Sequence, residues 1–245
     1  MHDYRDALHK SLLFYRAQRS GDLSGGPNPI PWRTAPSFLS DGADVGVDLS
    51  KGYFDAGDYV KYGQPLAYTL SVLAWSGIEY AEQIEHAGSL TELKLAVRWG
   101  TDYILQAAKH ISTSCTFYAQ VGRGAAKHCR GAACKFDHGY WGRPEDYHRD
   151  FEFASLRRTY RVNATHPGIE IWAAASAALS SAHLLFERDD RVYAAQLLGV
   201  SRALYACATA REHNVKNLRL QEYLPEVCVR AHEAWPLLAQ GLHLA

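Results

Sequence analysis

The chain has 245 residues, of which 47% are hydrophobic and 21% are charged, and its 26 basic side chains are matched by 26 acidic ones. This composition is typical of a globular domain, since it offers enough apolar side chains for a core and too little charge for a disordered chain. Zero formal net charge excludes the broad positive field that non-specific nucleic-acid binding requires. We expect no membrane span either, because no run of about 18 or more apolar residues occurs.

The cysteines do not predict a metal site, and the sequence leaves open whether any of them form disulfides. They stand at positions 115, 129, 134, 207 and 228, an odd number without C-x-x-C spacing. The spacing argues against zinc, although Cys129 and Cys134 lie close to His128 and His138. The simplest interpretation is unpaired cysteines, and we expect no metal ligands and no cofactor.

Two features point to different compartments. Met1 is followed almost at once by an amphipathic segment, which leaves no room for the charged and apolar regions of a secretory signal. The sequon Asn163-Ala164-Thr165, by contrast, would accept an N-linked glycan in a secretory pathway. An incomplete N-terminus would reconcile the two observations.

Five segments have the hydrophobic spacing of helices. In the first, residues 3–19, Leu8, Leu12 and Tyr15 share one face and Asp3 is a potential N-cap. The other four segments lie at residues 65–85, 89–109, 168–186 and 193–208. The segment that begins with Pro65 has few polar positions and should be well buried, and no segment shows the alternation of a strand.

Two long connections rich in glycine and proline, residues 21–63 and 110–167, separate these helices. Structureless loops longer than about 12–15 residues are uncommon, so we expect a functional role for the first of these connections. Helices joined alternately by short turns and long loops are typical of an α-hairpin array or toroid. After about residue 213 the pattern changes, and Pro225 and Pro236 interrupt the remaining helix-like residues.

The strongest functional signal is the run from Gly52 to Gly63, Gly-Tyr-Phe-Asp-Ala-Gly-Asp-Tyr-Val-Lys-Tyr-Gly. Asp55 and Asp58 are three residues apart, and Gly57 lets the backbone turn tightly enough for both carboxylates to hold one water. Such a pair suits glycoside hydrolysis, in which one carboxylate activates or orients a water. Four neighbouring aromatic residues would offer flat faces to sugar rings: Tyr53, Phe54, Tyr59 and Tyr62. The structural alternative is a surface Asx turn with these rings packed in the core.

A second cluster, residues 137–146, combines His138, Tyr140, Trp141 and Arg143 on a loop that glycine and proline constrain. These side chains are suited to hydrogen-bonding hydroxyl groups and to stacking on pyranose rings. The alternative is a packed loop in which Arg143 pairs with an acidic neighbour.

Trp32 and Arg33, in the first connection, supply a further aromatic ring and cation, or else an anchor for that loop. Together with the two clusters they belong to a series of motifs that recurs in this order in one family. The series is Trp32-Arg33, Ser40-Asp41-Gly42, Asp48-Leu49, Gly52 to Gly63, Gln120-Val121-Gly122, His138 to Asp146 and Pro167-Gly168. Over residues 3 to about 213 the chain resembles the N-terminal half of a family 9 glycoside hydrolase, an endo-β-1,4-glucanase or cellulase, and the animal members most.

The resemblance implies roles for the matching residues. Asp58 matches the general base that takes a proton from the attacking water, and Asp55 matches the carboxylate that positions this water and keeps its partner ionised. Five side chains are expected to contact a β-1,4-glucan substrate: His138, Tyr140, Trp141, Trp32 and Tyr53. The family inverts the anomeric configuration, which fits a base and an acid about 6.5–9.5 Å apart.

The resemblance also implies an all-α (α/α)6 barrel of twelve helices, with about half of the toroid in this chain. We expect residues 1–213 to form the N-terminal part of the catalytic domain and residues 214–245 a divergent tail. The family's general acid is a glutamate near the C-terminus of a longer domain, and neither Glu222 nor Glu226 should take its role. Residues 129–136 resemble an insertion beside the cleft.

Three functional hypotheses follow. The first is an inverting endo-β-1,4-glucanase, a hydrolase secreted like its family, in a truncated form whose activity the missing acid would reduce by roughly 10²–10⁴. The second is a non-catalytic glucan-binding remnant or an incomplete gene model. The third is an interaction protein, because the inner helix faces of half a toroid would expose apolar surface to another chain. The sequence leaves the oligomeric state open.

Overall fold

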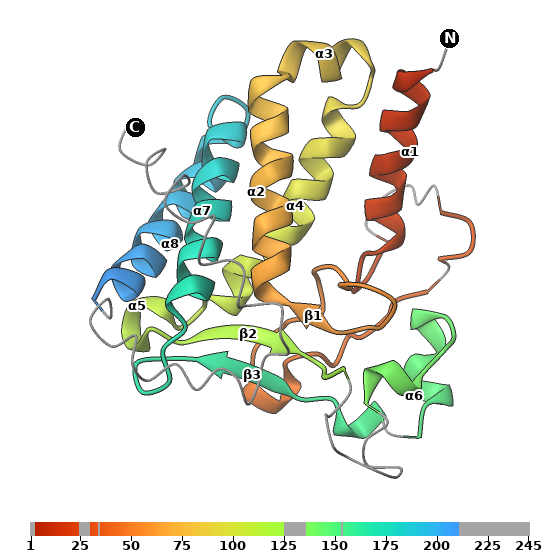
Figure 1. The fold of residues 1–245 in the computed structure, drawn as a ribbon, viewed down its shortest axis with the longest axis vertical. Coiled ribbons are helices and arrows are strands. Elements are labelled where there is room, and N and C mark those ends of the chain that lie inside the picture. The colour runs from red at the N-terminus through yellow and green to blue at the C-terminus, as the bar shows by residue number, and fades with distance from the viewer. Residues whose placement is uncertain (1–2, 25–29, 34, 125–135, 153, 211–245) are drawn as a thin grey trace.

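The computed structural model describes residues 3–24, 30–33, 35–124, 136–152 and 154–210. The long helices lie alongside one another, and a small sheet crosses one end of them (Figure 1). The long helices are α1 (Tyr4–Ala17), α2 (Gly63–Glu79), α4 (Leu90–Ala107), α7 (Ile169–Phe186) and α8 (Arg191–Thr209). They confirm the five predicted helices and the mostly helical architecture. The predicted tail, residues 214–245, and most of the predicted insertion, residues 129–135, lie outside the described residues.

Shorter elements connect the long helices. The short helices are α3 (Ala81–His86), α5 (Ile111–Ser114) and α6 (Tyr147–Asp150), and single 3-10 turns are η1 (Ala43–Val45), η3 (Asp137–Gly139), η4 (Pro144–Asp146) and η5 (Ala154–Leu156). The strands are β1 (Lys61–Tyr62), β2 (Phe117–Val121) and β3 (Thr159–Val162). The long connections meet at the sheet end of the helices, whereas a short turn joins α7 to α8 at the other end (Figure 1).

Side-chain caps fix where two of the long helices begin. Asp3 precedes α1 and accepts hydrogen bonds from the backbone amides of Arg5 (3.0 Å) and Asp6 (3.1 Å), as predicted. Asp190 precedes α8 in the same way and accepts a hydrogen bond from the amide of Tyr193 at 3.1 Å. These carboxylates satisfy amides that have no partner within the helix, and their charge suits the positive end of its dipole.

The prediction that the chain contains no strands is wrong. β2 pairs antiparallel with both β1 and β3, with Lys61 opposite Val121 and Gln120 opposite Tyr160. All five residues of β2 are buried, so this strand has no polar face and no alternation for a pattern search to find. β1 has only two residues, too few for any periodicity.

α7 is the central helix of the core, since it packs against α2 on one side and α8 on the other. Twelve of its 18 residues are buried, and many of them are alanines that allow close approach. Gly77 of α2 lies at this junction, where an added Cβ would come within 2.7 Å of Leu93 and 2.8 Å of Leu185. Among the described helices, α7 alone is long and apolar enough to cross a membrane, but its burial between two helices is typical of a core helix.

α2 is less buried than its sequence suggests. One face packs into the core, but Tyr68, Val72 and Trp75 form an exposed stripe at helical spacing, with exposed fractions of 61%, 49% and 43%. The stripe lines a surface pocket of about 310 Å³. The apolar composition of α2 therefore reflects two apolar faces, of which the core covers one.

The expectation of unpaired cysteines is wrong for two of the five. Cys115 and Cys207 form a disulfide that joins the end of α5 to α8 across 92 residues of sequence, with their Cα atoms 5.7 Å apart. Disulfides persist in oxidising compartments and are rare in the cytosol. Sequence spacing does not reveal the pair because the packing of α5 against α8 brings its members together.

Candidate functional site

The Asp55–Asp58 run forms a tight turn at the entrance to β1. The amide of Asp55 donates a hydrogen bond to the carbonyl of Val60 at 3.0 Å, and one carboxylate oxygen of Asp58 accepts from the amide of Val60 at 2.9 Å. The Asx turn that we considered as the structural alternative is therefore present. It does not exclude a chemical role, because the turn leaves the second oxygen of Asp58 available for another partner.

That partner is His138, which lies on η3 some 80 residues later in the sequence. Its Nε2 is in direct polar contact with Oδ2 of Asp58. The Asp58 side chain is only 4% exposed, whereas the His138 side chain is 57% exposed, so the pair lies at the surface with its carboxylate inward. The structure thus joins the two sequence clusters at one point.

Small and polar groups surround this contact. An added Cβ at Gly124 would lie 3.4 Å from both His138 Nε2 and the Tyr62 hydroxyl, so the backbone of Gly124 packs directly against both side chains. Burial raises the pKa of Tyr62 to about 12, and Asp58 and Asp55 act in the same direction. The phenol therefore stays neutral and can donate or accept a hydrogen bond beside the carboxylates.

The two aspartates differ in their surroundings. Asp55 is exposed, and among the described residues its carboxylate has no hydrogen-bond partner. Burial and the nearby charge of Asp58 raise the pKa of Asp55. Burial also raises the pKa of Asp58, and the Val60 amide and His138 offset this only in part. The site therefore combines one open carboxylate with one enclosed carboxylate, both of which bind protons more readily than free aspartate.

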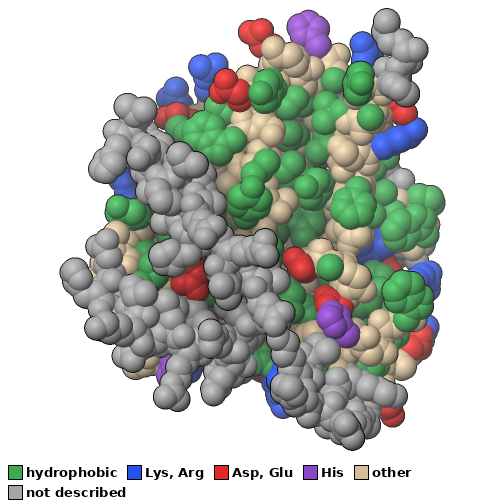
Figure 2. All heavy atoms as spheres, in the orientation of Figure 1, with side chains coloured by type: hydrophobic (Ala, Val, Ile, Leu, Met, Phe, Trp, Pro, Cys, Tyr) green, Lys and Arg blue, Asp and Glu red, His purple; other side chains and the backbone are tan. Residues whose placement is uncertain are grey.

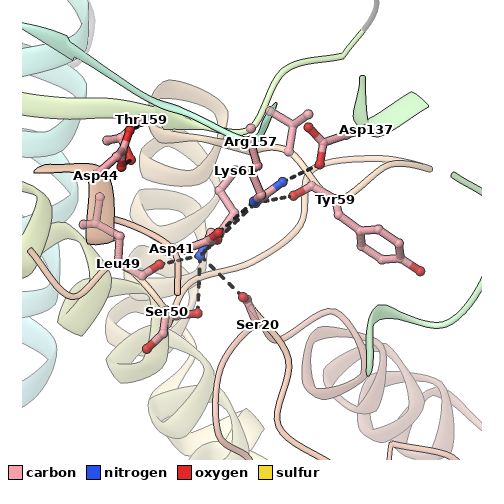
Figure 3. Close-up of polar contacts among 12 residues, drawn as sticks. Ser20, Asp41, Asp44, Leu49, Ser50, Tyr59, Lys61, Asp137, Arg157 and Thr159 are labelled. Atoms are coloured by element: carbon pink, nitrogen blue, oxygen red, sulfur yellow. Dashed lines mark hydrogen bonds and ion pairs between the residues drawn. The ribbon is translucent and has the colours of Figure 1, made fainter. Parts of the chain in front are cut away.

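A buried ionic cluster lies behind this turn (Figure 3). Asp41 accepts from Arg157 Nε and Lys61 Nζ, both at 2.7 Å, and the three side chains are at most 4% exposed. Arg157 also donates to the carbonyl of Tyr59 at 2.8 Å and pairs with the carboxylate of Asp137. Tyr59 directly follows Asp58, and Asp137 directly precedes His138. The cluster therefore anchors both halves of the site.

Burial sets the charge states in this cluster. Burial alone would raise the pKa of Asp41, but Lys61 and Arg157 beside it hold the pKa below its usual value. Burial lowers the pKa of Lys61 to about 8, although Asp41 acts in the opposite direction. Near neutral pH both groups therefore remain mostly charged, and they face each other as an ion pair.

The predicted aromatic contacts fall into different environments. Trp141 is 94% exposed, and Trp32 is 55% exposed. Tyr140 is half-buried and packs against Tyr147, with ring centroids 5.2 Å apart. Tyr53 belongs to the core and donates its hydroxyl to the carbonyl of Ala96 at 2.8 Å. Trp32, Trp141 and Tyr140 therefore keep more ring surface for a ligand than Tyr53, which is only 7% exposed.

The two arginines of the sequence motifs take structural roles. Arg33 is fully buried and pairs with Glu145 at 2.6 Å, so it anchors the first connection to η4. Arg143 pairs with Asp146 at 2.8 Å, as the packed-loop alternative predicts. Sequence reasoning missed Arg157 altogether, because it lies outside both clusters. Gly122 in the motif Gln120-Val121-Gly122 was the one sequence signal of a close approach at this point. An added Cβ there would lie 2.3 Å from Arg157.

Three further predictions concern sites outside this pair. Asn163 is half-buried in the turn after β3, where its side-chain oxygen accepts from the amides of Thr165 (3.0 Å) and His166 (2.9 Å). Among the described residues no group of three or more His, Cys, Asp or Glu side chains is placed to bind a metal ion. His128, Cys129 and Cys134 lie outside the described residues.

Comparison with protein families gives a match over most of the chain. The model of Glycosyl hydrolase family 9 aligns with residues 4–226, which include every residue of the site described above. Endoglucanase 20 of Oryza sativa subsp. japonica is 42% identical over 204 residues, which is 83% of this chain and 36% of that protein. Endoglucanase 16 of Arabidopsis thaliana is 41% identical over 210 residues, 86% of this chain and 39% of that protein.

Solved structures give the same result. The endoglucanase of the termite Nasutitermes takasagoensis superimposes with a TM-score of 0.73 at 40% identity, covering 85% of this chain and 43% of that one. The cellulase Cel9M of C. cellulolyticum in complex with cellobiose superimposes with a TM-score of 0.72 at 35% identity, covering 86% of this chain and 44% of that one. The chain therefore spans less than half the length of these relatives.

Proposed function

Because the chain belongs to glycosyl hydrolase family 9, we propose that it carries the water-activating part of a site that hydrolyses β-1,4-glucosidic bonds with inversion. Its relatives are endoglucanases, and a solved relative holds cellobiose, which supports cellulose or a cello-oligosaccharide as the ligand. Residues 1–213 are proposed as the N-terminal part of the catalytic domain. The single observation that carries the proposal is the Asp58–His138 pair beside the open carboxylate of Asp55.

In this proposal Asp58 is the general base. Water attacks the anomeric carbon from the face opposite the leaving oxygen, and the water proton passes to the Asp58 carboxylate. A raised pKa makes the buried carboxylate a better proton acceptor than free aspartate. Asp55 holds the same water through its open carboxylate. Protonation of the leaving oxygen requires a second carboxylic acid, and we assign that role to no residue of this chain.

The substrate contacts are proposed for the groups that remain accessible. His138 is 57% exposed on its side chain, so its ring can hydrogen-bond a sugar hydroxyl while Nε2 faces Asp58. Trp141, Trp32 and Tyr140 would stack on pyranose rings. Tyr53 is left out of the proposal because its ring is buried and its hydroxyl already has a partner.

The deciding experiment measures hydrolysis and binding together. The purified chain is incubated with carboxymethyl-cellulose and cellopentaose, reducing ends are counted, and the anomer released first is identified by ¹H NMR. We expect Asp58→Asn to lower the rate roughly 10²–10⁴-fold. Asp55→Asn should lower the rate while leaving binding intact, and Asp6→Asn, at an exposed ion pair on α1, is the control. Turnover that survives Asp58→Asn, or release of the retained anomer, would refute the proposal.

Glucan binding without turnover is a second candidate, favoured by the exposed rings of Trp141 and Trp32. Replacement of Trp141 by alanine should then weaken cellopentaose binding by about 1–3 kcal/mol if this ring stacks as aromatic platforms do in other ligand sites. Binding of the wild-type chain with no detectable reducing ends would select this candidate over catalysis. Binding equal in wild type and Trp141→Ala would remove Trp141 from the site.

We also propose that the chain matures in a secretory pathway, where Asn163 receives an N-linked glycan. The Cys115–Cys207 disulfide supports an oxidising compartment independently of the sequon. Expression through a eukaryotic secretory pathway should give a chain whose mass falls on treatment with an endoglycosidase that removes N-linked glycans. Asn163→Gln and Thr165→Ala should each abolish that change. An unchanged mass for the secreted wild-type chain would show that the sequon is not used.

A further inference from the structure

Arg157 lies where three segments that are distant in the sequence meet (Figure 3). The first is the connection that carries Asp41, the second is the turn that ends at Tyr59, and the third is η3 with Asp137. The Arg157 side chain is only 4% exposed. Its guanidinium therefore contacts three segments of the chain at once and links their positions.

The contacts use all three nitrogens of the guanidinium. Nε and Nη2 donate to the two oxygens of Asp41 at 2.7 and 3.0 Å, a bidentate pair. Nη2 also donates to the carbonyl of Tyr59 at 2.8 Å, and Nη1 donates to Asp137. Because the guanidinium is planar and rigid, a shift of any one partner misaligns the others.

The Asp137 contact is itself held from the other side. The second carboxylate oxygen of Asp137 accepts from the amide of Arg123 at 2.7 Å, and the amide of Asp137 donates to the carbonyl of Arg123 at 2.9 Å. Gly122 makes room for this arrangement, since an added Cβ would lie 2.3 Å from Arg157 and 2.8 Å from Asp137. Its positive φ of 84° also favours glycine.

Tyr59 directly follows Asp58, and Asp137 directly precedes His138. We propose that Arg157 is a positioning residue, which sets the distance between Asp58 and His138 by holding the Tyr59 carbonyl and the Asp137 carboxylate on one rigid guanidinium. A role of this positioning in catalysis rests on the proposed function, whereas the positioning itself is present without substrate. Phe38 supports the guanidinium from one face, with the Arg157 Cζ 4.5 Å from the ring centroid.

The test follows the His138 ring by NMR in ligand-free protein labelled with ¹⁵N-histidine, with the resonance assigned through His138→Gln. Asp58→Asn removes the contact directly and gives the reference shift. Arg157→Lys keeps the positive charge but lacks the planar fork, so we expect it to move the His138 resonance in the direction of the Asp58→Asn position. Asp137→Asn has nearly the same shape as wild type, breaks the charged contact from the other end and should move the resonance in the same direction.

The matched control is Arg98→Lys, because Arg98 also pairs with an aspartate, Asp190 at 2.5 Å, and lies over an aromatic ring, Tyr193, at 4.0 Å. It should leave the His138 resonance unchanged. The proposal is overturned if Arg157→Lys or Asp137→Asn folds and leaves the resonance at its wild-type position. It is also overturned if Asp58→Asn leaves the His138 resonance in place. If Arg157→Lys does not fold, Asp137→Asn alone decides the question.

A separate titration of the wild-type chain with cellotriose tests the proposed function. Absence of binding would count against glucan recognition and leave the ligand-free result standing. Conversely, cellotriose binding with an unmoved His138 resonance in Arg157→Lys would keep the function and remove Arg157 from its positioning role.

Discussion

Opposing influences act on the pKa of Asp58, and the balance between them predicts a pH effect. Burial raises the pKa of its carboxyl group, and the Val60 amide and the nearby His138 lower it. Replacing His138 by glutamine removes its lowering influence, so the pKa of Asp58 should rise further. A general base works only when ionised, and the acid limb of any activity profile should therefore move to higher pH.

A ¹³C NMR titration of the Asp58 carboxyl group measures this shift without needing turnover. His86→Gln serves as the control, because within the described part of the chain the His86 ring bonds only to the carbonyl of Glu82 in its own helix. An Asp58 pKa that falls or stays constant in His138→Gln would contradict the electrostatic account of the pair.

Asp41 predicts how the stability of the chain depends on acid. Lys61 and Arg157 hold the pKa of Asp41 below its unfolded value of about 4 against the opposing effect of burial. The unfolded state therefore binds a proton first as the pH falls. The stabilisation by Asp41 is fully present above about pH 4 and is lost as the pH falls toward the lower, folded pKa.

Asp41→Asn should remove this part of the acid dependence. At pH 7 we expect the variant to lose about 3–5 kcal/mol of unfolding free energy, because two buried cations lose their partner. Between about pH 5 and 3 its stability should fall less steeply than that of wild type. Urea unfolding at several pH values gives both quantities, and parallel curves for the two proteins would disprove the assignment.

The site shows which residues a sequence can reveal. Asp55, Asp58 and His138 stand in dense motifs of chemically suitable side chains, and the last two do meet in the structure. Tyr53 stands in the same motif but points into the core, since a local pattern does not say which face of a turn is buried. Arg157 has no local pattern at all, because its partners come from three distant segments.

At the scale of elements, helices were predictable and strands were not. α1 and α8 begin at side-chain caps and carry their apolar residues at helical spacing, which are local properties of their own residues. β2 is defined by its two neighbours, with every residue buried, and nothing in its own five residues alternates. The pairing of α5 with α8 is likewise a property of the packed fold, and the disulfide between them followed from no spacing rule.

That disulfide should contribute measurable stability. Cys115 and Cys207 close a loop across 92 residues, so oxidation restricts the unfolded chain considerably. We expect the double variant Cys115→Ser/Cys207→Ser to lose about 2–4 kcal/mol of unfolding free energy relative to the oxidised wild type. Chemical denaturation with and without dithiothreitol measures this difference.

The double variant also provides the control for reduction. Dithiothreitol should lower the Tm of wild type and leave the Tm of Cys115→Ser/Cys207→Ser unchanged. Equal sensitivity of both proteins to the reductant would mean that other cysteines carry the effect, and no loss in either would mean that the bond adds no stability.

At the scale of the whole molecule, the open face of α2 stands out. Figure 2 shows hydrophobic side chains gathered on the face where α2 lies in Figure 1. Tyr68, Val72 and Trp75 occupy successive turns of this face and line its pocket of about 310 Å³. Contiguous apolar surface of this kind on a protein drives association.

We therefore expect the purified chain to self-associate. Its mass from light scattering should exceed 27.3 kDa and rise with protein concentration, and it should bind the dye ANS. The double variant Tyr68→Glu/Trp75→Glu places two charges in the stripe and should shift the mass toward that of one chain. Val192→Glu is the matched control, because Val192 is 84% exposed at the start of α8, away from the stripe, and should leave the association unchanged. The expectation is wrong if the wild-type chain stays at 27.3 kDa over a hundredfold range of concentration and binds no ANS. The α2 face would then remain exposed to solvent without causing association.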